Sequence, residues 1–324
     1  MPSTFLMPLA IIAALLVSVA ACGGGGKKDA LSAAQLCAAI PEVLGNVASP
    51  DIIEASGIVA SRDNEGVLWL HNDSGDSARV FAIDRAGARL GTYTLHGAEA
   101  IDWEDMAIGP GPDDGVDYLY LADIGDNAAA RDDIVVYRVP EPDVALSPNL
   151  LNGGGMPAEK LVLRYPDHAH DAETLLVDPE SGDIVIVTKE LTSPPSLVFR
   201  APAPIAPGTP TTLERAGQID FSALGTGSQP PADAPPLVSG VPDLPTGGDV
   251  SPDGRSVAIR TYAYVWLWDR PDGSPLTDAF TTTPCQAPSA IEQQGEAIAL
   301  DVDGKGYITV SEGANAALNH FAVR

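Results

Sequence analysis

The sequence predicts an all-β fold, because one strand–turn–strand pattern returns along most of its 324 residues. In five segments, a small or acidic residue precedes an apolar strand, a turn containing Gly or Asp, and a second apolar strand. No long helical pattern follows residue 40, and 32 glycines with 29 prolines indicate many turns between short strands. Antiparallel units repeated at about 45–75 residues are typical of the blades of a β-propeller.

The five units give the order of the predicted blades. Their first strands begin near Glu54, Trp103, Ala172, Gly247 and Gly295. Turn sequences at residues 179–183 and 252–254 join first to second strands, as in β-hairpins. Third strands follow in most units, for example at residues 80–84. A strand at residues 43–47 is expected to complete the last blade and close the ring, which leaves few unpaired strand edges.

The number of blades stays open at five or six. A degenerate sixth blade is considered around residues 211–221, whereas residues 225–245 are rich in Pro, Gly and Ala and are predicted to form a loop. A sandwich or a barrel is the competing architecture, but the acid at the start of each unit disfavours both. The sequence therefore predicts a single propeller domain at residues 43–324, with five visible blades.

The N-terminus predicts export and lipid attachment. Residues 5–21 are almost all apolar, and Val19-Ala20-Ala21-Cys22 is followed by a glycine run. This segment resembles a bacterial lipobox, which implies removal of residues 1–21, diacylglycerol on Cys22 and a flexible tether at residues 22–42. No Lys or Arg precedes the apolar stretch, unlike most signal peptides, so a membrane-spanning anchor or an unlipidated signal peptide are the alternatives. The expected location is the extracytoplasmic cell envelope, on the outer membrane if the organism has one.

Two further cysteines, Cys37 and Cys285, have two open interpretations. An oxidising envelope would allow them to form a disulfide, and the alternative is two separately buried thiols.

The charge balance excludes one large class of partner. Lys and Arg total 18 against 44 Asp and Glu, which gives a formal net charge of −26. A phosphate backbone requires a basic surface, so nucleic acid is not expected as a partner. The sequence gives no indication of oligomeric state.

The repeated acids predict a cation site. The first strand of each blade lines the central channel and the second runs antiparallel beside it, so strand starts and second-strand ends share one mouth of the channel. The carboxylates expected there are those of Glu54, Asp105, Asp123, Glu173, Glu190, Asp249, Glu296 and Glu312. Such a cluster must bind a cation, pair with Lys189 and Arg260, or keep some members protonated. Hard oxygen ligands favour Ca²⁺, although a structural role for the acids is the alternative.

The function expected from this site is metal-assisted hydrolysis of an ester, most plausibly a phosphate ester. Lys189 and Arg260 are candidates for holding an anionic group beside carboxylate-bound Ca²⁺, with Glu173 as a third candidate catalytic residue. The competing hypothesis is a non-catalytic propeller that binds an envelope protein or glycan. Whether the protein is an enzyme is therefore left open.

Three motifs resemble a known group of proteins. They are His71-Asn72-Asp73-Ser74-Gly75-Asp76, residues 102–107 and residues 122–127. Together they are similar to a family of secreted bacterial propellers near the phytase-like (esterase-like) and SdiA-regulated propeller groups. The resemblance covers about residues 53–321, and its phytase-like side implies calcium and phosphate esters.

One further motif is a pair of histidines, His168 and His170, separated by Ala169. Alternating histidines on an extended segment can chelate a metal, but no further His lies in a fitting arrangement. The favoured interpretation is a solvent-exposed loop, with His170 and Asp171 retaining a smaller chance of a role in the pocket.

Overall fold

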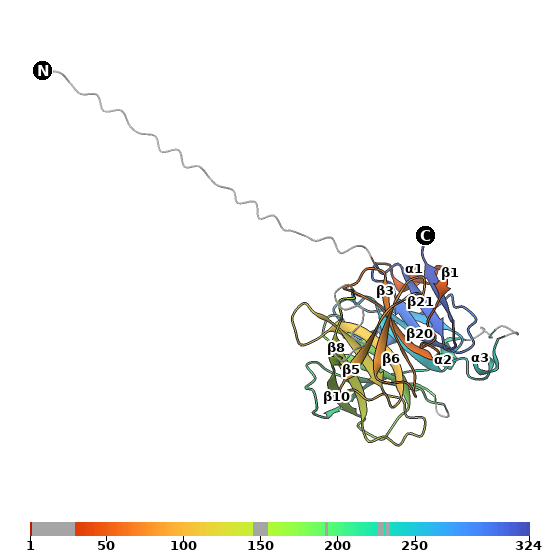
Figure 1. The fold of residues 1–324 in the computed structure, drawn as a ribbon, viewed down its shortest axis with the longest axis horizontal. Helices are drawn as coiled ribbons and strands as arrows, with labels where there is room; N and C mark the ends of the chain where they lie inside the picture. The colour runs from red at the N-terminus through yellow and green to blue at the C-terminus, as the bar shows by residue number, and fades with distance from the viewer. Residues whose placement is uncertain (2–29, 145–154, 192–193, 226–229, 231–233) are drawn as a thin grey trace.

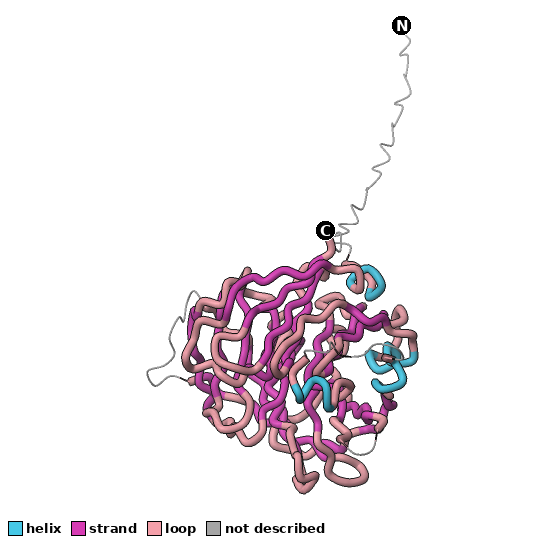
Figure 2. The backbone as a smooth tube through the Cα atoms, turned by 90° about the vertical axis from the view of Figure 1, so that its right-hand side faces the viewer, coloured by secondary structure: helices cyan, strands magenta, loops and turns pink. Residues whose placement is uncertain are grey.

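The computed structural model describes residues 1, 30–144, 155–191, 194–225, 230 and 234–324, and these form a five-bladed β-propeller (Figure 1). The predicted signal segment and the lipidation site at Cys22 lie outside the described residues. Strands and loops make up nearly all of the backbone, and helices are limited to short segments (Figure 2). Among the residues that the structure describes, no helix is both long and apolar enough to cross a membrane.

Each blade is one antiparallel sheet whose strands follow the chain outward from the channel. The exceptions are two short parallel edge strands and the outer strand of the last blade, which comes from the N-terminus. Blade 1 contains β2 (Ala55–Ala60), β3 (Val67–Asn72), β4 (Arg79–Asp84), β5 (Arg89–His96) and the edge strand β9 (Met156–Pro157). Blade 2 contains β6 (Trp103–Pro110), β7 (Asp117–Asp123), β8 (Ile134–Pro140), β10 (Glu159–Arg164) and the edge strand β14 (Thr211–Thr212). Blade 3 contains β11 (Ala172–Val177), β12 (Ile184–Thr188), β13 (Ser196–Ala201) and β15 (Glu214–Ile219).

The last two blades complete the ring. Blade 4 contains β16 (Pro245–Val250), β17 (Ser256–Thr261), β18 (Val265–Asp269) and β19 (Cys285–Ala287). Blade 5 contains β20 (Gly295–Leu300), β21 (Gly306–Ser311), β22 (Ala317–Ala322) and β1 (Ile40–Asn46). The short helices are α1 (Ala33–Leu36), α2 (Phe221–Leu224), α3 (Pro236–Gly240) and the 3₁₀ helix η1 (Leu276–Thr281).

A sixth blade is not formed by the described residues. Residues 211–221 supply β14, which pairs in parallel with β10, and β15, which is the outer strand of blade 3. The segment does form strands, as its sequence indicates, but these strands complete the sheets of blades 2 and 3 and do not start a new sheet.

The core is divided into layers between adjacent blades. The inner strands β2, β11, β16 and β20 are buried along their whole length, because they have neighbouring strands on both faces and a narrow channel beside them. Separate apolar clusters fill the spaces between neighbours: Trp69, Tyr93 and Trp103 lie between blades 1 and 2, for example. Each blade therefore depends on two neighbours for its burial, which favours a closed ring.

The ring is closed by the N-terminal strand, as predicted. β1 pairs antiparallel with β22 from Ile40 opposite Ala322 to Asn46 opposite Ala317, so the first and last strands share one sheet (Figure 1). The structure also joins Cys37 to Cys285 by a disulfide that links the segment before β1 to the outer strand of blade 4.

The predicted boundary between tether and propeller, at residues 42 and 43, is too late. The backbone N–H of Leu31 already donates to the carbonyl of Gly304 at 3.2 Å, and Ala33 and Leu36 are buried against blades 4 and 5. Apolar residues before β1 thus belong to the packed domain, and any tether ends near residue 30.

Candidate functional site at the channel mouth

Every inner strand begins with a β-bulge, and the extra residue of each bulge occupies the same place in the five blades. The register with the second strand shifts across one residue, which is Ser56, Glu104, Glu173, Thr246 or Glu296. Bulges re-aim a side chain out of the sheet alternation. Glu104, Glu173 and Glu296 are buried, and Glu173 interacts electrostatically with each of the other two. We call these five residues the bulge ring.

A residue just after the second strand forms a further ring at the same end. It directly follows the strand in blades 1, 3, 4 and 5 and is the second residue after the strand in blade 2. Its backbone N–H donates to the carbonyl of the residue before the inner strand, at 2.8–3.2 Å in all five blades. The donors are Asp73, Gly125, Lys189, Tyr262 and Glu312, and the acceptors are Glu54, Asp102, Asp171, Leu244 and Gln294. Carboxylates from both rings are thereby gathered at one mouth of the channel.

Three carboxylates of blades 1 and 2 form the tightest group. Asp73, Asp102 and Glu104 each offer an oxygen, and these oxygens lie within 4.8 Å of one another. Gly125 makes room for them, since a Cβ at that position would lie 2.1 Å from Oε1 of Glu104 and 2.5 Å from Oδ2 of Asp102. The arrangement therefore requires the absence of a side chain at one position of the second ring.

Burial and mutual repulsion make these acids hard to ionise without a cation. Burial and the nearby charges of Asp73 and Asp171 raise the pKa of Asp102 to about 6. Burial and the charges of Glu173 and Asp73 raise the pKa of Glu104 well above its ordinary value. A bound cation would reverse both effects, because it favours the charged form of each carboxyl group.

Blade 3, next to blade 2, carries the compensating positive charge of the mouth. The ammonium of Lys189 contacts the carboxylate of Glu173 and donates to the hydroxyl of Tyr262 at 3.0 Å. Burial disfavours the charged lysine, but the attraction of Glu173 and Tyr262 outweighs it and raises the pKa of Lys189. Burial raises the pKa of Glu173 to about 7, and Lys189 opposes that rise. Lys189 thus stays charged at neutral pH.

Two more acids leave the mouth with an excess of carboxyl groups. Glu296 is 3% exposed, and its Oε2 has no hydrogen-bond partner among the described residues. Burial and the charge of Asp73 raise the pKa of Glu312 to about 7. These groups, with the three carboxylates of blades 1 and 2, outnumber the ammonium of Lys189.

Asp105 and Asp249, which the sequence placed in the metal site, have a different role. Asp105 accepts hydrogen bonds from the backbone N–H groups of Met106, Leu175 and Gly248, at 2.8–3.0 Å. Asp249 accepts from Val250 and Leu300, both at 2.7 Å. Both carboxylates tie inner strands of different blades together around the channel, so the geometry gives them a structural role.

The remaining predicted ligands have other partners or are exposed. Asp123 is buried and forms an ion pair with Arg131 at 2.9 Å, and Glu190 contacts His170 at 3.0 Å. Glu54 is exposed beside Asp73, and it adds to the negative charge that Asp73 experiences.

Arg260 does not face the mouth. Its Nη1 lies 2.8 Å from Glu292 and donates to the carbonyl of Ala297 at 3.1 Å, between blades 4 and 5. Gly295 provides the space, since a Cβ there would lie 1.8 Å from Nη2 of Arg260. This geometry therefore does not support Arg260 as an anion-binding residue. Of the two predicted anion-binding residues, only Lys189 faces the mouth.

The sequence pattern missed Glu104 and the small members of the bulge ring. The sequence repeat places Asp105 beside Glu173 and Glu296, but the structural repeat is the residue that opens the strand followed by the bulge residue, as in Ala172-Glu173 and Gly295-Glu296. Trp103-Glu104 is the corresponding pair in blade 2, and this alignment identifies Glu104 as a member of the bulge ring. Asp102 and Asp73 lay inside quoted motifs but were not assigned as ligands.

Comparisons with known proteins found similarity to solved structures alone. No protein-family model matches the chain, and no curated protein matches it either. Hydrazine synthase of Kuenenia stuttgartiensis is similar in structure with a TM-score of 0.41 and 13% identity, over 84% of this chain and 96% of that one. The β-propeller domain of Myceliophteria thermophila Cps50 (Swd1) gives a TM-score of 0.42 and 12% identity, over 88% of this chain and 100% of that one. The strand order established above makes the chain a β-propeller.

Proposed function

We propose that the channel mouth binds a divalent cation, Ca²⁺ by its donor chemistry, through Asp73, Asp102 and Glu104. The observation that carries the proposal is the convergence of three carboxylates on the space left by Gly125. Carboxylate oxygens without sulfur or imidazole donors suit a hard cation such as Ca²⁺.

The second part of the proposal is an anionic ligand between the cation and Lys189. The cation would polarise a phosphoryl or carbonyl oxygen of that ligand, and the ammonium of Lys189 would hold a second oxygen. The ion pair with Glu173 keeps Lys189 charged for this task. Phosphate esters are the first substrate class to test, in line with the resemblance to phytase-like propellers, and hydrolysis is the proposed reaction.

The location is proposed from the N-terminal sequence. A lipid on Cys22 would hold the propeller at the extracytoplasmic face of a membrane, and the packed domain begins near residue 30. Replacing Cys22 with Ser should move the protein from the membrane fraction to the soluble fraction. Unchanged membrane association would contradict the lipid anchor.

The cation site is tested by thermal unfolding of the full chain in detergent, after EDTA treatment and with added Ca²⁺. A ligand at 100 times its Kd stabilises the native state by about 2.7 kcal/mol. With an unfolding entropy of roughly 0.6 kcal/mol/K for a chain of about 300 residues, Tm should rise by about 4 °C. Glu104→Gln should lose this rise, whereas Glu65→Gln, an exposed acid in the turn at the other end of blade 1, should keep it.

The outcomes separate the two hypotheses about function. No calcium-dependent rise in the wild type, or a rise retained by Glu104→Gln, would overturn the cation site. A rise together with calcium-dependent release of phosphate from ester substrates supports hydrolysis. Capture of an envelope protein or glycan that is insensitive to chelator would favour the non-catalytic binding propeller.

A further inference from the structure

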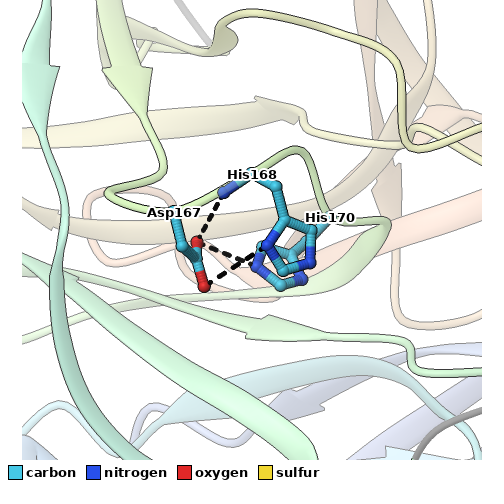
Figure 3. Close-up of side chains that lie close together, drawn as sticks. All are labelled: Asp167, His168 and His170. Atoms are coloured by element: carbon cyan, nitrogen blue, oxygen red, sulfur yellow. Dashed lines mark hydrogen bonds and ion pairs between the residues drawn. The ribbon is translucent and has the colours of Figure 1, made fainter.

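A second cluster of metal-ligating side chains lies outside the channel mouth, in the loop between β10 and β11. Asp167, His168 and His170 each offer one donor atom, and these atoms lie within 4.8 Å of one another. The carboxylate of Asp167 faces both imidazole rings, whose centroids are 4.2 Å apart (Figure 3). The solvent-exposed loop favoured from the sequence is wrong for His170, which is only 4% exposed, and Asp167 supplies the third donor that the sequence pattern did not identify.

The donor atoms have the spacing of ligands that share one ion. Oδ1 of Asp167 lies 3.1 Å from Nε2 of His170, and Oδ2 lies 3.6 Å from Nδ1 of His168. In a tetrahedral site, zinc–nitrogen and zinc–oxygen bonds of about 2.0–2.2 Å place neighbouring ligand atoms about 3.3–3.6 Å apart. An ion can therefore enter with only small movements of the exposed His168.

A partly buried carboxylate fixes the orientation of His170. Oε1 of Glu190 lies 3.0 Å from Nδ1 of His170, and the ring packs edge-on against Tyr165 with centroids 4.9 Å apart. A proton held on Nδ1 by Glu190 leaves the Nε2 lone pair directed at Asp167 and His168. Carboxylate–histidine–metal arrangements of this kind are typical of zinc sites.

The cluster is open on one side. The side chain of His168 is 72% exposed and that of Asp167 is 38% exposed, and both line a hollow of about 400 Å³ together with Arg131 and Arg164. Two imidazoles and one carboxylate with an accessible face match the ligand set of zinc sites that keep a position for water. The carboxylate-only mouth, by contrast, suits a hard cation.

We infer that Asp167, His168 and His170 form a binding site for Zn²⁺ or a similar borderline-soft ion, with Glu190 as the residue that positions His170. Solvent fills the remaining coordination position, which faces the hollow. The site is independent of the calcium site proposed above, because the two share no ligand and differ in donor type.

The test is a Zn²⁺ titration of the full chain, without a polyhistidine tag, in detergent and in the presence of millimolar Ca²⁺. Isothermal titration calorimetry should show one zinc ion per chain, and Co²⁺ in its place should give visible ligand-field absorption. His168→Ala should weaken zinc affinity at least 10-fold, and this exposed residue can be replaced without loss of the fold. His96→Ala, an exposed histidine in blade 1, is the matched control and should leave the affinity unchanged.

The positioning role of Glu190 has its own variant. Glu190→Gln should weaken zinc affinity about 10- to 100-fold while Tm in the absence of metal stays unchanged. Absence of saturable zinc binding in the wild type would overturn the inference, as would equal affinity in the wild type and His168→Ala. Zinc that is displaced by Ca²⁺ would place the ion in the channel mouth and would overturn it too.

Discussion

Replacing Lys189 with Met removes the positive charge from the channel mouth and tests the electrostatic description directly. The side chains of Lys189 and Glu173 are only 9% and 6% exposed, so their pair is buried. Removing one partner of a buried pair costs about 3–5 kcal/mol, because the other charge is left without compensation. With an unfolding entropy of roughly 0.6 kcal/mol/K, Tm should fall by about 5–8 °C at pH 8.

The loss should depend on pH in a defined direction. Glu173 has a folded-state pKa of about 7, above its ordinary value of 4.5, so its charged form is the one that burial penalises. Without Lys189 the pKa rises further, and protonation at pH 5 removes the uncompensated charge. The difference in Tm between Lys189→Met and the wild type should therefore be smaller at pH 5 than at pH 8.

Differential scanning calorimetry of the chelated protein measures both effects. Lys160→Met is the matched control, because Lys160 is 44% exposed and lies 3.9 Å from an exposed Glu99, so its pair contributes at most about 1 kcal/mol. The double variant Lys189→Met with Glu173→Gln should recover part of the lost stability. If Lys189→Met and the Lys160→Met control have the same Tm at both pH values, the reasoning is refuted.

Three other perturbations test separate parts of the structure. Replacing Cys37 and Cys285 together with Ser should lower the unfolding free energy by about 2–5 kcal/mol, because loss of a bond between residues 248 positions apart removes a constraint on the unfolded chain. An unchanged urea midpoint would argue against the disulfide in solution. Hydrogen bonds to Asp301 and Glu42 raise the pKa of His320, so the stabilisation from its charged form is complete below pH 6.5 and is lost as pH rises through the folded-state pKa. The unfolding free energy of the wild type, measured in urea, should therefore exceed that of His320→Gln by less at pH 9 than at pH 5.5. An equal excess at both pH values would contradict this. Gly125→Ala should weaken Ca²⁺ binding at least 10-fold by calorimetry, because its Cβ would displace Glu104 and Asp102, whereas Gly217→Ala has open space and should bind normally.

The blade architecture could be predicted from the sequence because most strand pairs within a blade are neighbours in the chain. Alternating apolar residues and Gly- or Asp-containing turns define hairpins such as β11–β12 without knowledge of distant residues. The closing strand was also predictable, since a strand before the first unit has one open sheet edge to join. The choice between five and six blades stays open in the sequence, because sequence alone does not reveal that the outer strand at residues 214–219 completes blade 3.

The site was predicted less well because its residues depend on register. One extra residue at each bulge exchanges the faces of the sheet, so Glu104 and its neighbour Asp105 have opposite roles. Glu104 lies in the bulge ring, whereas Asp105 binds the backbone of two other blades. Both residues are acidic and stand side by side at the start of the same strand, so the sequence pattern does not distinguish them. Only the hydrogen-bond pairing between the strands shows which of the two is the bulge residue.

The channel mouth owes its proposed chemistry to differences among five equivalent positions. In the second ring, blade 1 has Asp73, blade 2 has Gly125 and blade 3 has Lys189, although the same backbone hydrogen bond positions all of them. Blades 1 and 2 therefore gather carboxylates around the space at Gly125, and blade 3 adds an ammonium held by Glu173. A ring with the same acidic residue in every blade would present five like charges, which a buried mouth cannot hold in ionised form. The mouth instead combines the acids of blades 1 and 2 with the Lys189–Glu173 pair of blade 3. An ion bound by those acids would leave the ammonium of Lys189, which Glu173 holds, as the positive group available to an anionic ligand.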